Sequence, residues 1–269
     1  MLGKLLKYEV KATARLFLPL YLTILIFAAI NRFFFAMPNI GEKPLSFSSL
    51  AMTISMVVYV TLMVGLVLMT LIVLIQRFYK NLLGDEGYLM FTLPVQSWSH
   101  ILSKLAVSML WTVVSGGVAF CSILFISSKN ISTIELYNGL SMVFNQFRQY
   151  FGASTYLVSF EAIVLGLLAI ASTILNIYAA IALGHLFSKY KLLVSFGMYI
   201  ALKTISQLFM TLITFIFWNK ATFGMEIHSM PSALQVNNFL LVSILYFGAI
   251  SAGYFILTNY ILKRKLNLE

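Results

Sequence analysis

Six long apolar stretches constrain the fold of this chain more than any other feature of its sequence. They cover approximately residues 16–36, 50–76, 105–127, 155–184, 192–218 and 238–262. A helix that crosses a bilayer needs about 20 apolar residues, because each residue adds about 1.5 Å against a hydrocarbon core of about 30 Å. The stretches are too long for the strands of a membrane barrel. The sequence therefore predicts an all-α integral membrane protein with six transmembrane helices, whose backbone groups are satisfied within each helix.

The composition excludes a soluble protein with a large core. The chain is 61% hydrophobic and 10% charged, whereas soluble domains average roughly 45–50% apolar and about 25% charged residues. A net charge of +10 is often a sign of a nucleic-acid-binding protein. Here, however, the basic residues lie at the ends of apolar runs. We therefore expect contacts with anionic membrane lipids and none with nucleic acid. The first apolar run is longer than that of a signal peptide and lacks a clear cleavage site, which predicts a retained span.

The basic residues also predict the orientation of the spans. With the N-terminus inside, twelve of the 18 Lys and Arg residues fall in inner segments, five lie in outer segments or at outer span ends, and Lys203 lies within a span. Basic residues are enriched in cytoplasmic loops. We therefore expect a multi-pass protein of the plasma membrane with both termini in the cytoplasm.

We expect one transmembrane domain over residues 1–269, with two amphipathic segments outside the spans. Residues 1–15 place leucines near one face and basic residues on the other, which fits either an interfacial helix or a basic anchor flank. The outer segment 128–154 carries apolar residues at helical spacing and predicts a helix. Packing on the other helices and contact with substrate are both open roles for that helix.

The largest predicted cytoplasmic loop, residues 77–104, has an unusual composition for an idle connection. An acidic pair stands between two glycines, a bulky apolar cluster follows, and a proline then disfavours a continuing helix. Apolar residues rimmed by charge are typical of an interaction site, although the loop also suits lipid headgroups with basic anchors. The candidate docking residues are Arg77, Lys80, Gly84, Asp85, Glu86, Gly87, Tyr88, Leu89, Met90, Phe91 and Pro94.

This loop, RFYKNLLGDEGYLMFTLPV followed by SHILSKL, resembles the ABC-2 type permeases, the membrane subunits of bacterial ATP-binding-cassette exporters. A similar GDEGYLMFTLPV followed by LSKL is familiar in permeases of Firmicutes. The topology of the whole chain is similar to that family, whereas residues 77–105 carry the motif. The resemblance is uninformative about substrate, although export of an antimicrobial peptide or another amphipathic compound is our preferred expectation.

The resemblance implies partners and roles for named residues. Two permease chains, identical or different, would pair above two ATPase subunits, which would hold the ATP and Mg, so that this chain binds no cofactor itself. The segment from about Arg77 to His100 corresponds to the family's coupling helix, and residues 1–15 correspond to its connecting helix. Asp85 and Glu86 would meet basic residues of the ATPase, and Tyr88 to Phe91 would fill its groove. A second cytoplasmic contact would comprise His185, Lys189 and Tyr190.

Polar residues within the predicted spans are candidates for a translocation path, because charges and amides in lipid are costly and often functional. These residues are Glu161, Asn176, Lys203 and Gln207. Lys203 lies near the middle of its span and Glu161 nearer the outer face, so the two differ in depth by several ångströms. For Lys203, the alternatives are a structural tether and a lining of the path that attracts an anionic or peptide substrate.

The sequence lacks the motifs of an enzyme. It has no GxxxxGK[ST] loop, no HExxH and no serine elbow, and its three histidines are too scattered for a metal site. We therefore expect no catalytic residue and no metal, with ATP hydrolysis on a separate subunit. Two alternatives to an exporter permease are an ATP-independent transporter or channel and a non-transporting scaffold or sensor subunit.

Overall fold

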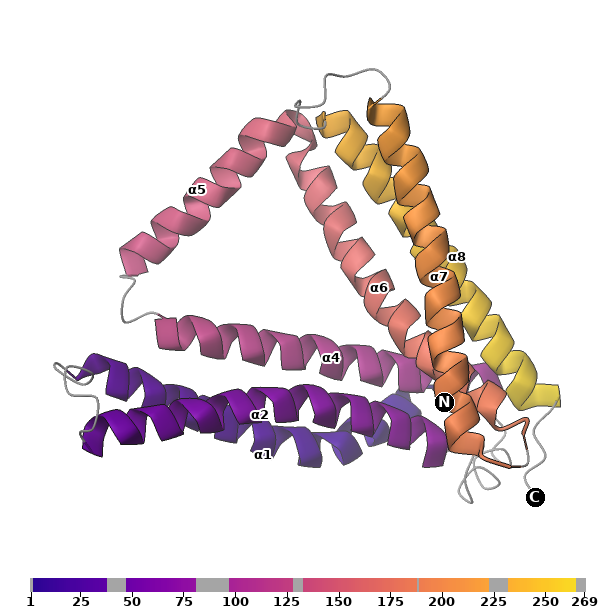
Figure 1. Cartoon of the computed structure of the whole chain (residues 1–269), viewed down its shortest axis with the longest axis horizontal. Coiled ribbons are helices and arrows are strands. Elements are labelled where there is room, and N and C mark those ends of the chain that lie inside the picture. The colour runs from indigo at the N-terminus through magenta and orange to yellow at the C-terminus, as the bar shows by residue number, and fades with distance from the viewer. Residues whose placement is uncertain are drawn as a thin grey trace. The chain divides into compact units, whose positions relative to one another are not determined.

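Nearly all of the residues that the structure describes are helical. This computed structural model describes residues 2–37, 47–80, 97–127, 133–187, 189–222 and 232–264, which contain no strand. The elements in chain order are α1 (Leu2–Ala36), α2 (Phe47–Phe78), α4 (Ser97–Ser127), α5 (Thr133–Phe151), the short 3-10 helix η2 (Gly152–Ser154), α6 (Thr155–Gly184), α7 (Lys191–Thr222) and α8 (Ala233–Arg264) (Figure 1).

Six stretches of helix within the described residues are long and apolar enough to cross a membrane. They are Leu5–Ala36, Phe47–Phe78, Ser97–Ser127, Tyr137–Gly184, Lys191–Phe217 and Ala233–Lys263. Many of their large apolar side chains are exposed, among them Leu18, Val67 and Leu245, as expected of helices whose surroundings are lipid. The prediction of an all-helical chain with six membrane-length helices is therefore confirmed for the described residues, and it indicates a multi-pass membrane protein.

The chain divides into two compact units. The first contains Met1–Leu74 and Leu110–Asn145, and the second contains Ile75–Met109 and Gln146–Glu269. The divisions fall within α2, α4 and α5, so each of these helices contributes one end to each unit. Both flanks of the predicted coupling loop therefore belong to the second unit, together with α6, α7 and α8.

In the first unit, an aromatic cluster joins α1 to α4. The Trp111 ring stacks on Phe17 with centroids 4.7 Å apart, and Trp111 Nε1 donates a hydrogen bond of 2.7 Å to Thr13 Oγ1. One turn further along each helix, the hydroxyls of Tyr21 and Ser115 are 2.8 Å apart. Such bonds between polar side chains hold helices together in a membrane, where lipid is as apolar as the helix surfaces.

Two further bonds of this kind attach α2 to its neighbours in the first unit. The Tyr59 hydroxyl lies 2.8 Å from Ser122 Oγ of α4. The Asn31 amide donates to the Ser55 carbonyl at 3.3 Å. Polar side chains therefore join α1, α2 and α4 into a bundle whose outer surface remains apolar.

The amphipathic N-terminal segment is continuous with the first span. Residues 2–15 are helical, and α1 runs on without a turn, since no glycine or proline lies between Gly3 and Pro19. Pro19 lacks the N–H that would bond the Arg15 carbonyl, and Thr23 Oγ1 donates to the Pro19 carbonyl at 2.8 Å. The segment 1–15 and the predicted span 16–36 therefore form one helix within the described residues.

In the second unit, α6 packs against both α7 and α8. Figure 1 shows α6 and α8 running in one direction and α7 in the other. Most residues of the second half of α6 are buried, including Asn176 and Tyr178. Between α5 and α6, Gly152 has a positive φ of 55°. The observed α6 has the same bounds as the predicted span 155–184.

Local side-chain bonds define the start of α8. The backbone N–H of Gln235 donates a hydrogen bond of 3.3 Å to Ser232 Oγ, and the backbone N–H of Ser232 donates one of 2.8 Å to Gln235 Oε1. This reciprocal arrangement is a capping box, which satisfies N–H groups that have no partner within the helix. The Ser-x-x-Gln spacing therefore fixes where the last span begins.

Candidate functional site

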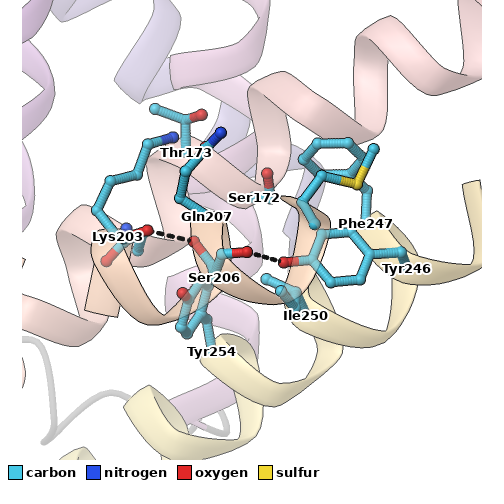
Figure 2. Close-up of a pocket in the computed structure, with 11 residues that line it drawn as sticks. Ser172, Thr173, Lys203, Ser206, Gln207, Tyr246, Phe247, Ile250 and Tyr254 are labelled. Carbon is cyan, nitrogen blue, oxygen red and sulfur yellow. Dashed lines mark hydrogen bonds between the residues drawn. The ribbon is translucent and has the colours of Figure 1, made fainter. Parts of the chain in front are cut away.

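A polar cavity of about 60 Å³ lies between α6, α7 and α8 in the second unit (Figure 2). We refer to it as the Lys203 pocket. It is lined by Ser172, Thr173, Asn176, Lys203, Ser206, Gln207, Met210, Tyr246, Phe247, Ile250 and Tyr254. All of these residues lie within membrane-length helices. The pocket therefore concentrates polar groups in segments whose other surfaces are mainly apolar.

Three of the four polar residues singled out from the sequence meet in this pocket. Asn176 comes from α6, and Lys203 and Gln207 lie one turn apart on α7. Asn176 is 2% exposed, whereas Lys203 and Gln207 are exposed. In Figure 2 the side chains of Lys203 and Gln207 extend in the same direction, toward Thr173. The pocket thus combines one cation with two amides.

The fourth residue, Glu161, does not line the pocket. It lies on α6, fifteen residues before Asn176, a separation of about 22 Å along a helix. Its side chain is 7% exposed, and Oε2 is buried without a hydrogen-bond partner in the described part of the chain. Glu161 therefore belongs to a different level of the bundle from Lys203.

Two tyrosines of α8 that the sequence analysis did not single out form one wall of the pocket. The Tyr246 hydroxyl donates to the Ser206 carbonyl of α7, and the Tyr254 hydroxyl donates to the Leu202 carbonyl at 3.2 Å. Tyrosines usually sit at the ends of spans, whereas these two lie within α8, eight residues apart. Their depth in the span was the signal that could have identified them.

The hydroxyl groups of the pocket donate to backbone carbonyls. Ser206 Oγ donates to the Lys203 carbonyl at 2.9 Å, as Figure 2 shows. Ser172 Oγ and Thr173 Oγ1 both donate to the Ala169 carbonyl, each at 2.9 Å. Because the hydrogens of these hydroxyl groups already form hydrogen bonds, the hydroxyl oxygens offer mainly acceptor lone pairs to the pocket.

Asn176 stands apart from these engaged groups. Its Oδ1 atom is buried and has no hydrogen-bond partner among the described residues. Leaving a buried polar atom unpaired costs free energy, so an unpaired amide in a pocket is a candidate ligand-binding group. The pocket lining includes no acidic residue to balance Lys203.

At the end of the second unit that carries the loop flanks, aromatic contacts join α2 to α6. The rings of Phe78 and Tyr178 stack with centroids 4.1 Å apart and planes 10° from parallel. The Tyr178 hydroxyl is 2.9 Å from Ser108 Oγ of α4. Tyr79, which directly follows α2, lies 5.0 Å from the His185 ring, centroid to centroid. Both flanks of the loop therefore contact α6 and its C-terminal end.

The predicted coupling residues themselves lie mostly outside the described residues. Arg77 is half-buried near the end of α2, and Lys80 is exposed. The remaining candidates are outside the described ranges, namely Gly84, Asp85, Glu86, Gly87, Tyr88, Leu89, Met90, Phe91 and Pro94.

Two basic residues at the start of α4 are buried, which sequence reasoning missed. His100 is 1% exposed and Lys104 is 3% exposed. With Ser108 they recur every four residues, which places all three on one face of α4. Lys104 is the last residue of the predicted loop 77–104 and is one of its basic residues. The four-residue recurrence of polar residues was the signal for its burial.

The predicted second contact lies between α6 and α7. His185 is half-buried, whereas Lys189 and Tyr190 are exposed. Burial lowers the pKa of His185, and the charge of Lys191 lowers it further. Tyr190 is 78% exposed and has a φ of 59°, which is uncommon for a bulky residue. A strained backbone that presents an exposed ring fits a contact surface.

Comparison with known proteins adds no family. No protein-family model, curated protein or solved structure matches this chain. Among the described residues, no group of three or more His, Cys, Asp or Glu side chains is arranged to hold a metal ion.

Proposed function

We propose that this chain is the membrane-spanning permease subunit of an ATP-binding-cassette exporter. It forms the translocation path with a second permease chain, and two separate ATPase subunits hydrolyse ATP below it. The chain lies in the plasma membrane with both termini in the cytoplasm. Its cargo is amphipathic, with an antimicrobial peptide as the preferred class. This proposal rests on the resemblance of the loop between the second and third spans to ABC-2 permeases.

One structural observation supports the proposal most directly: the flanks of that loop contact the helix that lines the pocket. Phe78 and Ser108 both meet Tyr178, and Tyr178 lies two residues from Asn176 on α6. A displacement of the loop by an ATPase would therefore act on α6 through packed side chains. Contiguous packing of this kind is a physical route for coupling two sites.

These contacts support the following mechanism. Closure of the two ATPases on ATP would move the loop, and its stacked flanks would shift α6 relative to α7 and α8. Since these three helices line the Lys203 pocket, the shift would change the shape and accessibility of its polar groups. Packed interfaces suit such a movement because they switch between discrete arrangements.

The proposal is tested by reversing the acidic pair of the loop. The double variant Asp85→Lys, Glu86→Lys should lose the ATPase subunits on extraction in mild detergent, with normal membrane insertion. Glu135→Lys, which makes the same exchange on the predicted outer side, should keep them. If the double variant carries its ATPase at the wild-type ratio, the loop is not the principal docking site and the proposal fails at that point.

A further inference from the structure

The Lys203 pocket has the groups expected of a site for an anion. We propose that it binds the anionic group, a carboxylate or a phosphate, of an amphipathic molecule. As a recognition site for exported cargo it rests on the proposed function, whereas binding itself requires neither ATP nor an ATPase.

Charge is the first argument. Lys203 lies near the middle of the membrane-length stretch Lys191–Phe217, where an ammonium group is costly unless it is paired or hydrated. No carboxylate lines the pocket, and Glu161 lies about four turns away along α6. The described residues therefore supply no counter-charge to Lys203, and an anionic ligand would supply it.

The hydrogen-bonding inventory is the second argument. The hydroxyl hydrogens of the pocket donate to carbonyls of α6 and α7. The donors left for a ligand are the ammonium of Lys203 and the amides of Asn176 and Gln207. Rotation of an amide by half a turn exchanges its oxygen and nitrogen, so the buried Asn176 side chain is able to present N–H groups. Charge-assisted bonds from such donors to an anion are short and strong.

The volume of the pocket and its apolar side chains indicate what the rest of the ligand is like. A cavity of about 60 Å³ has room for a few water molecules, whereas sites for whole drug-sized molecules enclose roughly 300–1,000 Å³. The pocket therefore takes a headgroup, and the remainder of the molecule extends beyond it. Met210, Phe247 and Ile250 contribute apolar surface beside the polar groups, which suits a hydrocarbon chain next to an anionic end.

The test is equilibrium binding of radiolabelled dodecanoate to the purified full-length chain in an uncharged detergent, without ATP. Dodecanol, of equal chain length but uncharged, serves as a competitor. We expect Lys203→Met to weaken dodecanoate binding on the order of ten- to a hundredfold, as loss of a charge-assisted bond does. Lys203→Arg should retain binding, and Lys191→Met, a charge removal outside the pocket on the same helix, should leave it unchanged.

A second variant separates loss of binding from loss of folding. Asn176→Leu should weaken dodecanoate binding, while Asn237→Leu should not. Asn237 is half-buried, lies outside the pocket and also has a buried Oδ1 atom without a partner among the described residues. Each variant is first checked for a wild-type elution profile and thermal midpoint. Competition by phosphatidylglycerol would assign the anion to a membrane lipid, and binding that resists this lipid would assign it to a free amphiphile.

Two results would overturn the proposal. One is wild-type affinity of folded Lys203→Met for dodecanoate, and the other is competition by dodecanol as strong as that by unlabelled dodecanoate. Neither result depends on an ATPase, so this failure is distinguishable from a failure of the docking experiment on Asp85 and Glu86.

Discussion

The ring of Phe78 lies stacked on the ring of Tyr178, with centroids 4.1 Å apart. Phe78 is the last residue of α2, and Tyr178 lies on α6 two residues beyond Asn176. Both side chains are fully buried. This contact joins the start of the segment that resembles a coupling helix to the helix that contributes Asn176 to the Lys203 pocket.

Truncation of Tyr178 should therefore cost far more than removal of its hydroxyl. Tyr178→Ala loses the stack and leaves a cavity, which we expect to lower the free energy of unfolding by about 3–5 kcal/mol. Tyr178→Phe keeps the ring and removes the hydroxyl that lies 2.9 Å from Ser108 Oγ. Bonds of this kind between membrane helices average about 0.6 kcal/mol. Thermal midpoints of the purified variants in detergent give the comparison, and equal losses would contradict the importance of the stack.

Trp111 and Thr13 provide a second test, within the first unit. Thr13→Val keeps the shape of the side chain but removes the acceptor of the Trp111 N–H, so the buried donor is left unpaired. We expect a loss of about 1–3 kcal/mol. Thr23→Val is the control, because the Thr23 hydroxyl bonds a carbonyl of its own helix. Equal losses of stability in the two variants would show that the bond between α1 and α4 stabilises the chain no more than a bond within one helix does.

His185 should make the stability of the chain sensitive to mildly acidic pH. Its pKa is lowered by burial and by Lys191, so the unfolded state takes up the proton first as the pH falls. The stabilisation is fully present above the unfolded value of about 6.5 and is lost as the pH falls from there toward the lowered pKa.

The measurement for His185 is the thermal midpoint at pH 7.5 and at pH 5.5. His185→Gln should show a smaller fall between the two than the wild type. Lys191→Met should also show a smaller fall, because the pKa of His185 moves back toward its ordinary value. An unchanged fall in His185→Gln would assign the pH sensitivity to another group.

Tyr190 should show opposite effects on stability and on partner binding. Its positive φ is strained for a residue with a side chain, and glycine relieves that strain. Tyr190→Gly is therefore expected to leave stability unchanged or to raise it by a few tenths to about 1 kcal/mol. If the exposed ring contacts an ATPase, the same variant should carry less of it on extraction. Unaltered association would remove Tyr190 from the second cytoplasmic contact.

Much of the helical architecture was predictable because the length of an apolar run is tied to bilayer thickness. The predicted span 155–184 matches α6, which follows the positive-φ Gly152 and ends at Gly184. Three of the four polar residues in the spans meet in one pocket. Such residues turn toward other helices, since lipid offers them no hydrogen bonds.

Other features required the three-dimensional structure. Tyr246 and Tyr254 lie within α8 rather than at its ends, but their bonds to α7 depend on how α7 and α8 pack. The burial of Lys104 depends on the face that α4 presents to its neighbours, which a count of loop charges does not capture. By contrast, the difference in depth between Glu161 and Lys203 was already expected from the sequence.

The most direct test of the central claim is to extract the native complex through this chain in mild detergent and to identify the accompanying proteins by mass spectrometry. We expect a soluble P-loop ATPase at one copy per permease chain. A second permease of similar size would indicate a heterodimer. Recovery of the chain alone, from membranes in which it functions, would contradict the account and favour transport without an ATPase.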